Sequence, residues 1–306
     1  MDPIAHRRPP PASALMDRRE FLSGALLLFA GGCASRPHLA VGSKNFTEQL
    51  LLGEMLAESL RPVTSLPVEE RFYLAGSYIC QQALLAGRID TYVEYTGTAL
   101  TAILKDPPSS DSKLVYQRVK DEYRRRFDLE VMPPLGFNNS FAMVMRRDQA
   151  ERLGIATLSQ LAPFAPRLRM GVGYEFLERQ DGYSGLIQRY GLKFAAPPRV
   201  MDLGLVYRAL ENHQVDLVAG SNTDGLIAAL HLVVLQDDLR YFPPYDAVPI
   251  VRAQTLAAHP EIRPVFSRLA GKISADDMRQ LNYKVDGQKQ DAAVVARDFL
   301  VERRLL

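Results

Sequence analysis

Three short polar segments carry the side chains best suited to bind a small charged molecule. Residues 43–47 stand between an apolar run and a helical pattern, where Lys44 and free backbone N–H groups favour an anion. Residues 94–98 place an aromatic ring beside hydroxyl groups. Residues 175–179 include Arg179, whose guanidinium can hold a carboxylate through two hydrogen bonds. Together these segments indicate a site for a small zwitterion.

Each of these side chains also has a purely structural interpretation. Lys44 can be a solvated lysine at the start of a helix. Tyr95 can pack in the core or at a hinge, and Arg179 can pair with a neighbouring glutamate. The residue types alone leave both interpretations open.

Motifs for catalysis and for cofactors are missing from the sequence. It contains no G-x-S-x-G, no P-loop, no H-E-x-x-H and no complete G-x-G-x-x-G. The five histidines never pair at metal-ligand spacing, and the two cysteines do not form C-x-x-C. Cys80 is expected in the core as a small side chain. We therefore expect no enzyme activity, no cofactor and no metal.

Length and composition fit an ordinary globular protein. The chain has 306 residues, of which 47% are hydrophobic and 24% are charged. That length suggests about two domains. Lys and Arg number 37 against 35 Asp and Glu, and no long basic run occurs, so a nucleic-acid partner is not expected.

The N-terminal segment has the pattern of an export signal. The apolar run 21–30 follows charged residues and is too short to span a bilayer, so residues 1–32 are interpreted as a signal peptide cleaved before Cys33. Arg18 and Arg19 resemble a twin-arginine signal. Cys33 ends a string similar to a bacterial lipobox and is the expected lipidation site; an ordinary cleaved signal is the alternative. The protein is therefore expected in the periplasm or as a membrane-anchored lipoprotein, with contact to the membrane only through that anchor.

Strand and helix patterns alternate after the signal. The sequence predicts strands at 39–42, 68–74 and 89–93 and helices at 48–60 and 77–85. Asn45 or Thr47 is the expected N-cap of the first helix. This rhythm favours mainly parallel sheets covered by helices.

A short internal repeat divides the pattern into two similar parts. Residues 83–90 and 209–216 both read A-L-x-x-x-x, then Ile or Val, then Asp. Thr98 and Asp224 each stand eight residues beyond that aspartate. The repeat predicts two α/β lobes, each presenting a strand-end loop to a shared crevice.

Longer strings resemble the glycine betaine/choline substrate-binding proteins of ABC importers. In chain order they are VGSKNFTEQ at 41–49, YVEYTGTAL at 92–100, PLGFNN at 134–139, EFLERQDG at 175–182, TDG at 223–225, FPPY at 242–245 and LAGKIS at 269–274. The resemblance covers the chain from about residue 39 to 303.

This resemblance implies an α/β fold of the bilobal periplasmic-binding-protein type II, in which two α/β lobes enclose a ligand cleft. Lobe 1 is expected to comprise residues 39–137 and 247–306, and lobe 2 residues 138–246. The Pro- and Gly-rich segments 132–136 and 241–245 are the expected hinges.

The resemblance also implies the ligand-binding residues. In that family aromatic rings surround the quaternary ammonium, which has no N–H to donate and is attracted by ring faces. The implied set is Lys44, Thr98 and Arg179 on the carboxylate side, Tyr95, Tyr245 and Phe141 at ring positions with Phe46 beside them, and Asn139 and Ser221.

Two ring positions depart from the family pattern. Phe141 stands where the family usually has tyrosine, which keeps the ring and loses the hydroxyl. Residues 219–222 replace a segment that usually supplies an aromatic side chain, and Ser221 cannot supply one. A missing contact of about 0.5–2 kcal/mol weakens binding from about twofold to about thirtyfold. Either Tyr174 or Tyr183 substitutes for that ring, or the ligand is different.

The sequence as a whole predicts an extracytoplasmic solute-binding protein. It would capture small quaternary amines similar to glycine betaine and choline and deliver them to the permease subunit of an ABC importer for osmoprotectant uptake. A receptor for a different cationic metabolite or amino-acid derivative is one alternative, and an exported enzyme on the same fold is another.

Overall fold

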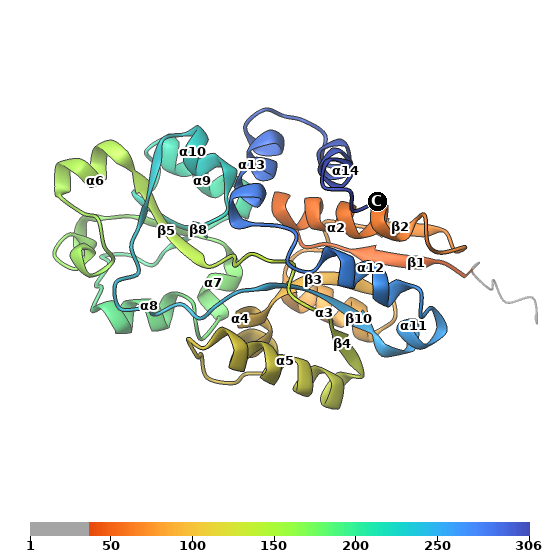
Figure 1. The fold of residues 1–306 in the computed structure, drawn as a ribbon. Coiled ribbons are helices and arrows are strands. Elements are labelled where there is room, and N and C mark those ends of the chain that lie inside the picture. Colours follow the sequence, from red (N-terminus) through yellow and green to blue (C-terminus); the bar gives the residue numbers. More distant parts are fainter. Residues whose placement is uncertain (1–36) are drawn as a thin grey trace, which may run out of the picture. The chain divides into compact units, whose positions relative to one another are not determined.

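The computed structural model describes residues 37–306, and Figure 1 shows their arrangement. The predicted signal peptide and the predicted lipidation site Cys33 lie outside the described residues. Among the residues described, no helix is both long enough and apolar enough to cross a membrane.

The first lobe is built on a five-stranded mixed sheet. Its strands, in spatial order, are β2 (Val68–Arg71), β1 (Leu39–Gly42), β3 (Thr91–Tyr95), β10 (Ala247–Arg252) and β4 (Leu129–Val131). β1 pairs in parallel with β2 and β3, whereas β10 pairs antiparallel with β3 and β4. A strand from late in the chain therefore completes a sheet formed by the early part.

The second lobe repeats this sheet with the same pattern of directions. Its strands are β7 (Arg199–Val200), β6 (Met170–Val172), β8 (Leu217–Ser221), β5 (Phe141–Arg146) and β9 (Leu232–Leu235). β6 pairs in parallel with β7 and β8, and β5 pairs antiparallel with β8 and β9. The predicted two-lobed α/β fold is confirmed. The exact lobe limits at residues 138 and 246 stay a prediction.

Helices pack against both sheets and connect their strands (Figure 1). In chain order they are α2 (Thr47–Leu60), α3 (Ser77–Leu85), α4 (Thr96–Thr98), the π-helix η1 (Ala99–Ile103), α5 (Ser112–Phe127), α6 (Arg147–Leu153), the 3-10 turns η2 (Ser159–Leu161) and η3 (Ala165–Arg167), α7 (Tyr174–Glu178), α8 (Tyr183–Tyr190), α9 (Leu203–Glu211), α10 (Gly225–Ala229), α11 (Ala253–Ala258), α12 (Ile262–Leu269), α13 (Ala275–Asp286) and α14 (Ala292–Glu302). α13 packs on α2 of the first lobe and on α10 of the second.

Helix α2 shows why the apolar pattern alone underestimates burial. Leu51, Leu52, Met55, Leu56 and Leu60 are buried and Leu50 is partly buried, but Glu48, Gln49 and Ser59 are buried as well. The helix is enclosed because it packs on the sheet and is also covered by α12, α13 and α14. Of the three polar side chains, Glu48 accepts four hydrogen bonds, whereas those of Gln49 and Ser59 have no hydrogen-bond partner among the described residues.

The internal repeat in the sequence corresponds to equivalent structural positions. Asp90 accepts a hydrogen bond from the N–H of Ala40 at 2.9 Å, and Asp216 accepts one from the N–H of Arg169 at 2.9 Å. Each aspartate precedes the central parallel strand of its sheet and binds the start of the neighbouring strand. The repeat thus marks the same strand connection in both lobes.

Two chain segments cross between the lobes side by side. They are joined by an antiparallel bridge between Asn138 and Asp246 and by the hydrogen bond from the N–H of Asn139 to the carbonyl of Tyr245, 2.9 Å long. Both crossings lie next to the Pro- and Gly-rich segments that the sequence indicated as hinges.

A few local predictions were wrong. The N-cap of α2 is Phe46, and neither Asn45 nor Thr47 takes that position. The Thr47 hydroxyl instead donates to Asp286 at 2.6 Å. Strand β3 begins two residues later than expected, because the backbone of Asp90 is already engaged with Ala40 before the pairing of β3 starts.

Candidate ligand-binding site

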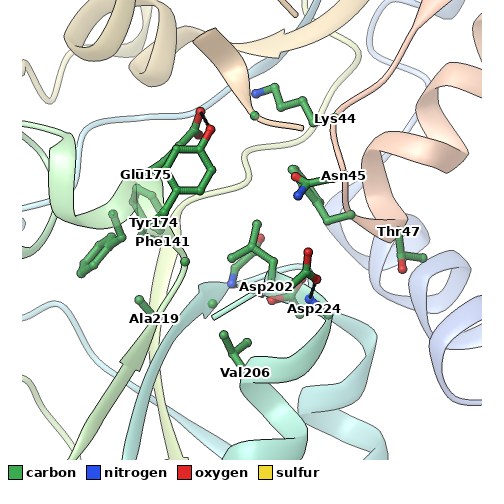
Figure 2. Close-up of a pocket in the computed structure, with 18 of the residues that line it drawn as sticks. Lys44, Asn45, Thr47, Phe141, Tyr174, Glu175, Asp202, Val206, Ala219 and Asp224 are labelled. Atoms are coloured by element: carbon green, nitrogen blue, oxygen red, sulfur yellow. Dashed lines mark hydrogen bonds between the residues drawn. The ribbon is translucent and has the colours of Figure 1, made fainter. Parts of the chain in front are cut away.

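A cavity of about 440 Å³ opens where strand-end loops of the two sheets face each other. The loops after β1 and β3 supply one side of its wall, and the loops after β6 and β8 supply the other. Figure 2 shows Phe141 on one side of this pocket and Lys44 and Asn45 on the opposite side. Such a crevice at the carboxyl ends of strands is where open α/β sheets bind ligands.

All nine ligand-binding residues predicted from the sequence line this single pocket. They are Lys44, Phe46, Tyr95, Thr98, Asn139, Phe141, Arg179, Ser221 and Tyr245. Residues separated by up to 201 positions in the chain, from Lys44 to Tyr245, are therefore brought together. That they bind a ligand stays a prediction.

The aromatic side chains form two groups on the pocket wall. Phe46 and Tyr95 stack with ring centroids 6.5 Å apart. Phe141 contacts Tyr245 and Phe176 in edge-to-face geometry at 5.6 and 4.9 Å. Such pairs hold their rings in fixed orientations.

Tyr245 owes its place partly to a glycine. A Cβ at Gly97 would lie 2.8 Å from the Tyr245 ring and 2.6 Å from the carbonyl oxygen of Pro244. Only a residue without a side chain allows this crossing segment to approach the end of β3 so closely. The Tyr245 hydroxyl then donates to Asp181 at 2.5 Å.

Tyr174 and Tyr183, the two side chains considered as substitutes for the ring missing at position 221, have different surroundings. Ser221 lines the pocket and forms a hydroxyl contact of 3.0 Å with Thr223. Tyr174 lines the pocket but is 45% exposed, whereas Tyr183 packs beside Phe194, 6.2 Å away. Of the two candidates, only Tyr174 is in a position to face a ligand.

Lys44 is buried and already paired. Its ammonium group forms an ion pair with Glu94, which is fully buried, and lies 4.7 Å from the centre of the Tyr95 ring. Glu94 also accepts hydrogen bonds from the Tyr92 hydroxyl at 3.1 Å and the Tyr95 N–H at 2.7 Å. Lys44 is therefore not a solvated lysine at the start of a helix, because it is buried, pairs with Glu94 and packs on the Tyr95 ring.

Arg179 is likewise paired inside the protein. Its guanidinium donates two hydrogen bonds to Asp181, at 2.9 and 2.6 Å, and a third to the Thr98 hydroxyl at 2.9 Å. Burial acts to raise the pKa of Asp181, but the adjacent Arg179 charge holds that pKa below its ordinary value. The contact with Thr98 joins the second lobe to the first. The pairing partner is an aspartate two residues along the chain, in place of the glutamate that the structural interpretation named.

The Arg179 guanidinium also occupies ring faces. It lies 5.0 Å from the centroid of Phe141 and 5.7 Å from that of Tyr245. These are cation–π distances, so the chain already places a cation of its own against two of the predicted ring positions.

Glu48 is a buried carboxylate that the sequence analysis did not single out. One of its oxygens accepts hydrogen bonds from the Tyr95 hydroxyl and the Asn139 amide, both at 2.6 Å. The other accepts from Thr223 at 2.5 Å and Asn282 at 3.1 Å. Burial raises the pKa of Glu48, and these four donors oppose that rise. Glu48 thereby connects α2, a crossing segment, the loop after β8 and α13.

Four further acidic side chains line the pocket: Glu175, Asp202, Asp224 and Asp286. Burial raises the pKa of Asp224 to about 7, although Tyr207 donates to it at 2.5 Å and the Ser221 N–H at 2.7 Å. Burial also raises the pKa of Asp286, although the Thr47 hydroxyl lowers it. The sequence analysis had marked the segments that contain Glu175 and Asp224, whereas no pattern in the sequence marked Asp202 or Asp286.

The fold and this pocket define a class of protein. Two mixed α/β sheets joined by paired crossings, with a polar and aromatic cavity between their loops, make a bilobal solute-binding protein of the type II periplasmic fold. Within residues 37–306, no group of acidic, histidine or cysteine side chains could hold a metal ion.

Comparison with known proteins identifies the family. Residues 37–302 match the family described as the substrate binding domain of ABC-type glycine betaine transport systems, and the chain belongs to this family. A glycine-betaine-binding protein of Pseudomonas aeruginosa is 37% identical over 298 residues, covering 91% of this chain and 92% of that protein. The carnitine transport binding protein OpuCC of Listeria monocytogenes is 34% identical over 284 residues, covering 92% of this chain and 91% of its own length.

A solved structure supports the same assignment. The crystal structure titled glycine betaine/carnitine/choline ABC transporter is 33% identical and superposes with a TM-score of 0.72, covering 87% of this chain and 99% of that one. Members of this family are substrate-binding components of transporters and not enzymes, and they work outside the cytoplasm. The predicted family is confirmed.

Proposed function

We propose that this protein binds a quaternary amine similar to glycine betaine or choline in the pocket described above and delivers it to the permease of an ABC importer. The observation that supports the proposal most is the meeting of Tyr95, Phe141 and Tyr245, with Phe46 beside them, in one cavity. A methylated ammonium cannot donate hydrogen bonds, so ring faces are the chemistry that recognises it. The glycine betaine and carnitine names of the two relatives point to the same class of ligand.

The other predicted residues complete the wall in this proposal. Asn139 is fixed by its bond to Glu48, while Thr98 and Arg179 join the two lobes beside the rings. Contacts to ligand from both lobes exist only when the lobes are together, so binding favours the closed arrangement that a permease can distinguish from the open one.

Binding to ring variants tests the proposal. Titration calorimetry with choline and with glycine betaine should give saturable binding to the purified protein. Tyr245→Leu removes the ring and should weaken the better-bound ligand by about twofold to thirtyfold. Tyr245→Phe keeps the ring and loses only the hydrogen bond to Asp181, so it is the matched control. Equal losses in both variants, or no binding of either ligand to the wild type, would exclude the ring site.

The location of the protein is a second part of the proposal. Export by a twin-arginine-like signal and lipidation of Cys33 would hold the protein at the outer face of the cytoplasmic membrane, within reach of its permease. Cys33→Ser should move the protein from the membrane fraction to the soluble fraction and leave ligand binding unchanged. Wild-type protein found entirely in the soluble fraction would show that no lipid anchor is added.

A further inference from the structure

The pocket wall has no positive group left for a ligand carboxylate. Lys44 pairs with Glu94, and Arg179 pairs with Asp181 through two hydrogen bonds. No other Lys or Arg of residues 37–306 lines the pocket. Each cation is thus neutralised by a buried carboxylate of the chain itself.

The N-terminus of helix α3, which could attract an anion, already lies beside a carboxylate of the protein. Helix α3 begins at Ser77, after Gly76, and its free N–H groups carry partial positive charge. The Glu175 carboxylate of the second lobe lies against this point, since a Cβ at Gly76 would come within 2.1 Å of Glu175 Oε1. A protein carboxylate therefore occupies the position that the helix end would offer to a ligand.

The remaining ionisable groups on the wall are all acidic. Glu175, Asp202, Asp224 and Asp286 line the cavity, and within the described chain none of the four forms an ion pair. Asp202 accepts only the N–H of Gly204, at 2.8 Å, as the N-cap of α9. Figure 2 shows Asp202 and Asp224 among the side chains of the pocket, both below Lys44 in that view.

Two buried polar groups on the wall are also unused, the Asn139 oxygen as an acceptor and the Ser77 hydroxyl as an acceptor or a donor. The Oδ1 atom of Asn139 and the Oγ atom of Ser77 have no hydrogen-bond partner among the described residues, and both residues line the pocket. Asn139 is 8% exposed and Ser77 is 1% exposed. One N–H of the Asn139 amide donates to Glu48, so this side chain still offers a ligand its acceptor oxygen and a second N–H.

Resting on the function proposed above, we infer that the pocket selects quaternary amines that carry net positive charge and end in a hydrogen-bond donor, a hydroxyl or an amine, over zwitterions that end in a carboxylate. The quaternary head meets the rings, and the donor end meets the acidic wall and the open acceptors. A carboxylate end would instead meet carboxylates, with every cation in the pocket already matched. According to this inference, the residues that determine specificity are Glu175, Asp202 and Asp224.

Two ligand pairs test the inference while holding the quaternary head constant. Choline and glycine betaine form the short pair. A longer pair is (3-aminopropyl)trimethylammonium and 4-(trimethylammonio)butanoate, which differ in an amine against a carboxylate at the far end. Calorimetry on the wild-type protein should show the donor-ended member binding at least tenfold more tightly in each pair.

Variants then assign the selectivity to the acidic wall. Asp202→Asn retains the capping side chain of α9 and removes the charge, so the protein should fold normally. Its preference for the donor-ended ligand should shrink severalfold, and Asp224→Asn should act in the same direction at pH 8, where Asp224 is ionised although burial raises its pKa to about 7. Asp148→Asn is the matched control, since Asp148 is an exposed acid on α6 that pairs only with Arg152 and lies outside the pocket. Thermal unfolding of each variant checks that the fold is intact.

The outcomes separate the two proposals. If the carboxylate-ended ligands bind as tightly or more tightly, the selectivity is wrong and the quaternary-amine function stands. If no ligand of either pair binds to the wild type, both proposals fail. If the wild type shows the preference but Asp202→Asn and Asp224→Asn keep it in full, the acidic wall is not its cause and the inference is overturned.

Discussion

Replacing Glu48 by glutamine tests whether one buried carboxylate holds the pocket together. Glu48 accepts hydrogen bonds from Tyr95 and Asn139 on one oxygen and from Thr223 and Asn282 on the other. Thr223 belongs to the second lobe and Tyr95 to the first, so the substitution weakens a connection between them.

The size of the effect follows from the number of acceptors. Glutamine has one acceptor oxygen, so its NH₂ group faces two donors and two charge-assisted hydrogen bonds are lost, at about 1.5–3 kcal/mol each. Part of this loss is offset because the amide does not carry the burial penalty that raises the pKa of Glu48. A net loss of about 2–4 kcal/mol in the free energy of unfolding results. At about 2–4 °C per kcal/mol, the Tm should fall by roughly 5–15 °C.

Urea and thermal unfolding can measure this loss in the free energy of unfolding for three proteins: the wild type, Glu48→Gln and Glu58→Gln. Glu58 lies on the same helix and pairs with Arg61 near the surface, so its substitution should cost less than about 1 kcal/mol. Choline binding to Glu48→Gln should also weaken severalfold, because the Tyr95 ring loses its hydroxyl anchor. If Glu48→Gln unfolds within about 0.5 kcal/mol of the wild type, the four hydrogen bonds do not stabilise the fold as argued.

Three further predictions address other groups. Burial raises the pKa of Glu54 to about 7, so between about pH 4.5 and 7 the folded state binds more protons than the unfolded state. The free energy of unfolding therefore falls as the pH rises through this range. In urea unfolding, Glu54→Gln should be about 1–2 kcal/mol more stable than the wild type at pH 8 and equally stable at pH 4. Arg179→Ala leaves Asp181 buried without its partner and should lower the free energy of unfolding by about 3–5 kcal/mol. It should weaken the binding of choline and of glycine betaine to the same extent. A loss of binding confined to glycine betaine would show that Arg179 contacts the ligand carboxylate directly. Ser221→Tyr adds a ring next to Phe141 and should tighten choline binding by about twofold to thirtyfold in calorimetry, whereas abolished binding would mean that the serine leaves necessary space.

Local patterns in the sequence were enough to predict the alternating elements and the two lobes. The apolar run of β1 and the periodic α2 were found to within one residue, because both depend on side chains adjacent in the chain. The repeated aspartates Asp90 and Asp216 were also visible, since each serves the same strand connection. The cap of α2 was missed because Thr47 bonds to Asp286, which is distant in sequence.

The pocket residues could be predicted only through the family strings, and their partners could not. Lys44 and Arg179 were visible as cations suited to an anion. Their carboxylate partners Glu94 and Asp181 were not recognised, and Glu94 is 50 positions from Lys44. The sequence does not distinguish a lysine or arginine that is paired with a carboxylate of the protein from one that is free to bind a ligand. Only the folded structure shows that Lys44 and Arg179 each form an ion pair with a buried carboxylate.

Glu48 shows the same limit more clearly, and it also bears on how binding and lobe contact are coupled. Its four partners stand 47, 91, 175 and 234 positions away, so no window of the sequence contains the cluster. Bringing the lobes together places Glu48 near Asp224, whose pKa is raised first by burial and to a smaller extent by the charge of Glu48. Like charges oppose that approach unless a positive charge lies between them. Hydrogen bonds across the lobes, such as the one from Thr223 to Glu48, offset this repulsion, and a cationic ligand that contacts both lobes would add to them.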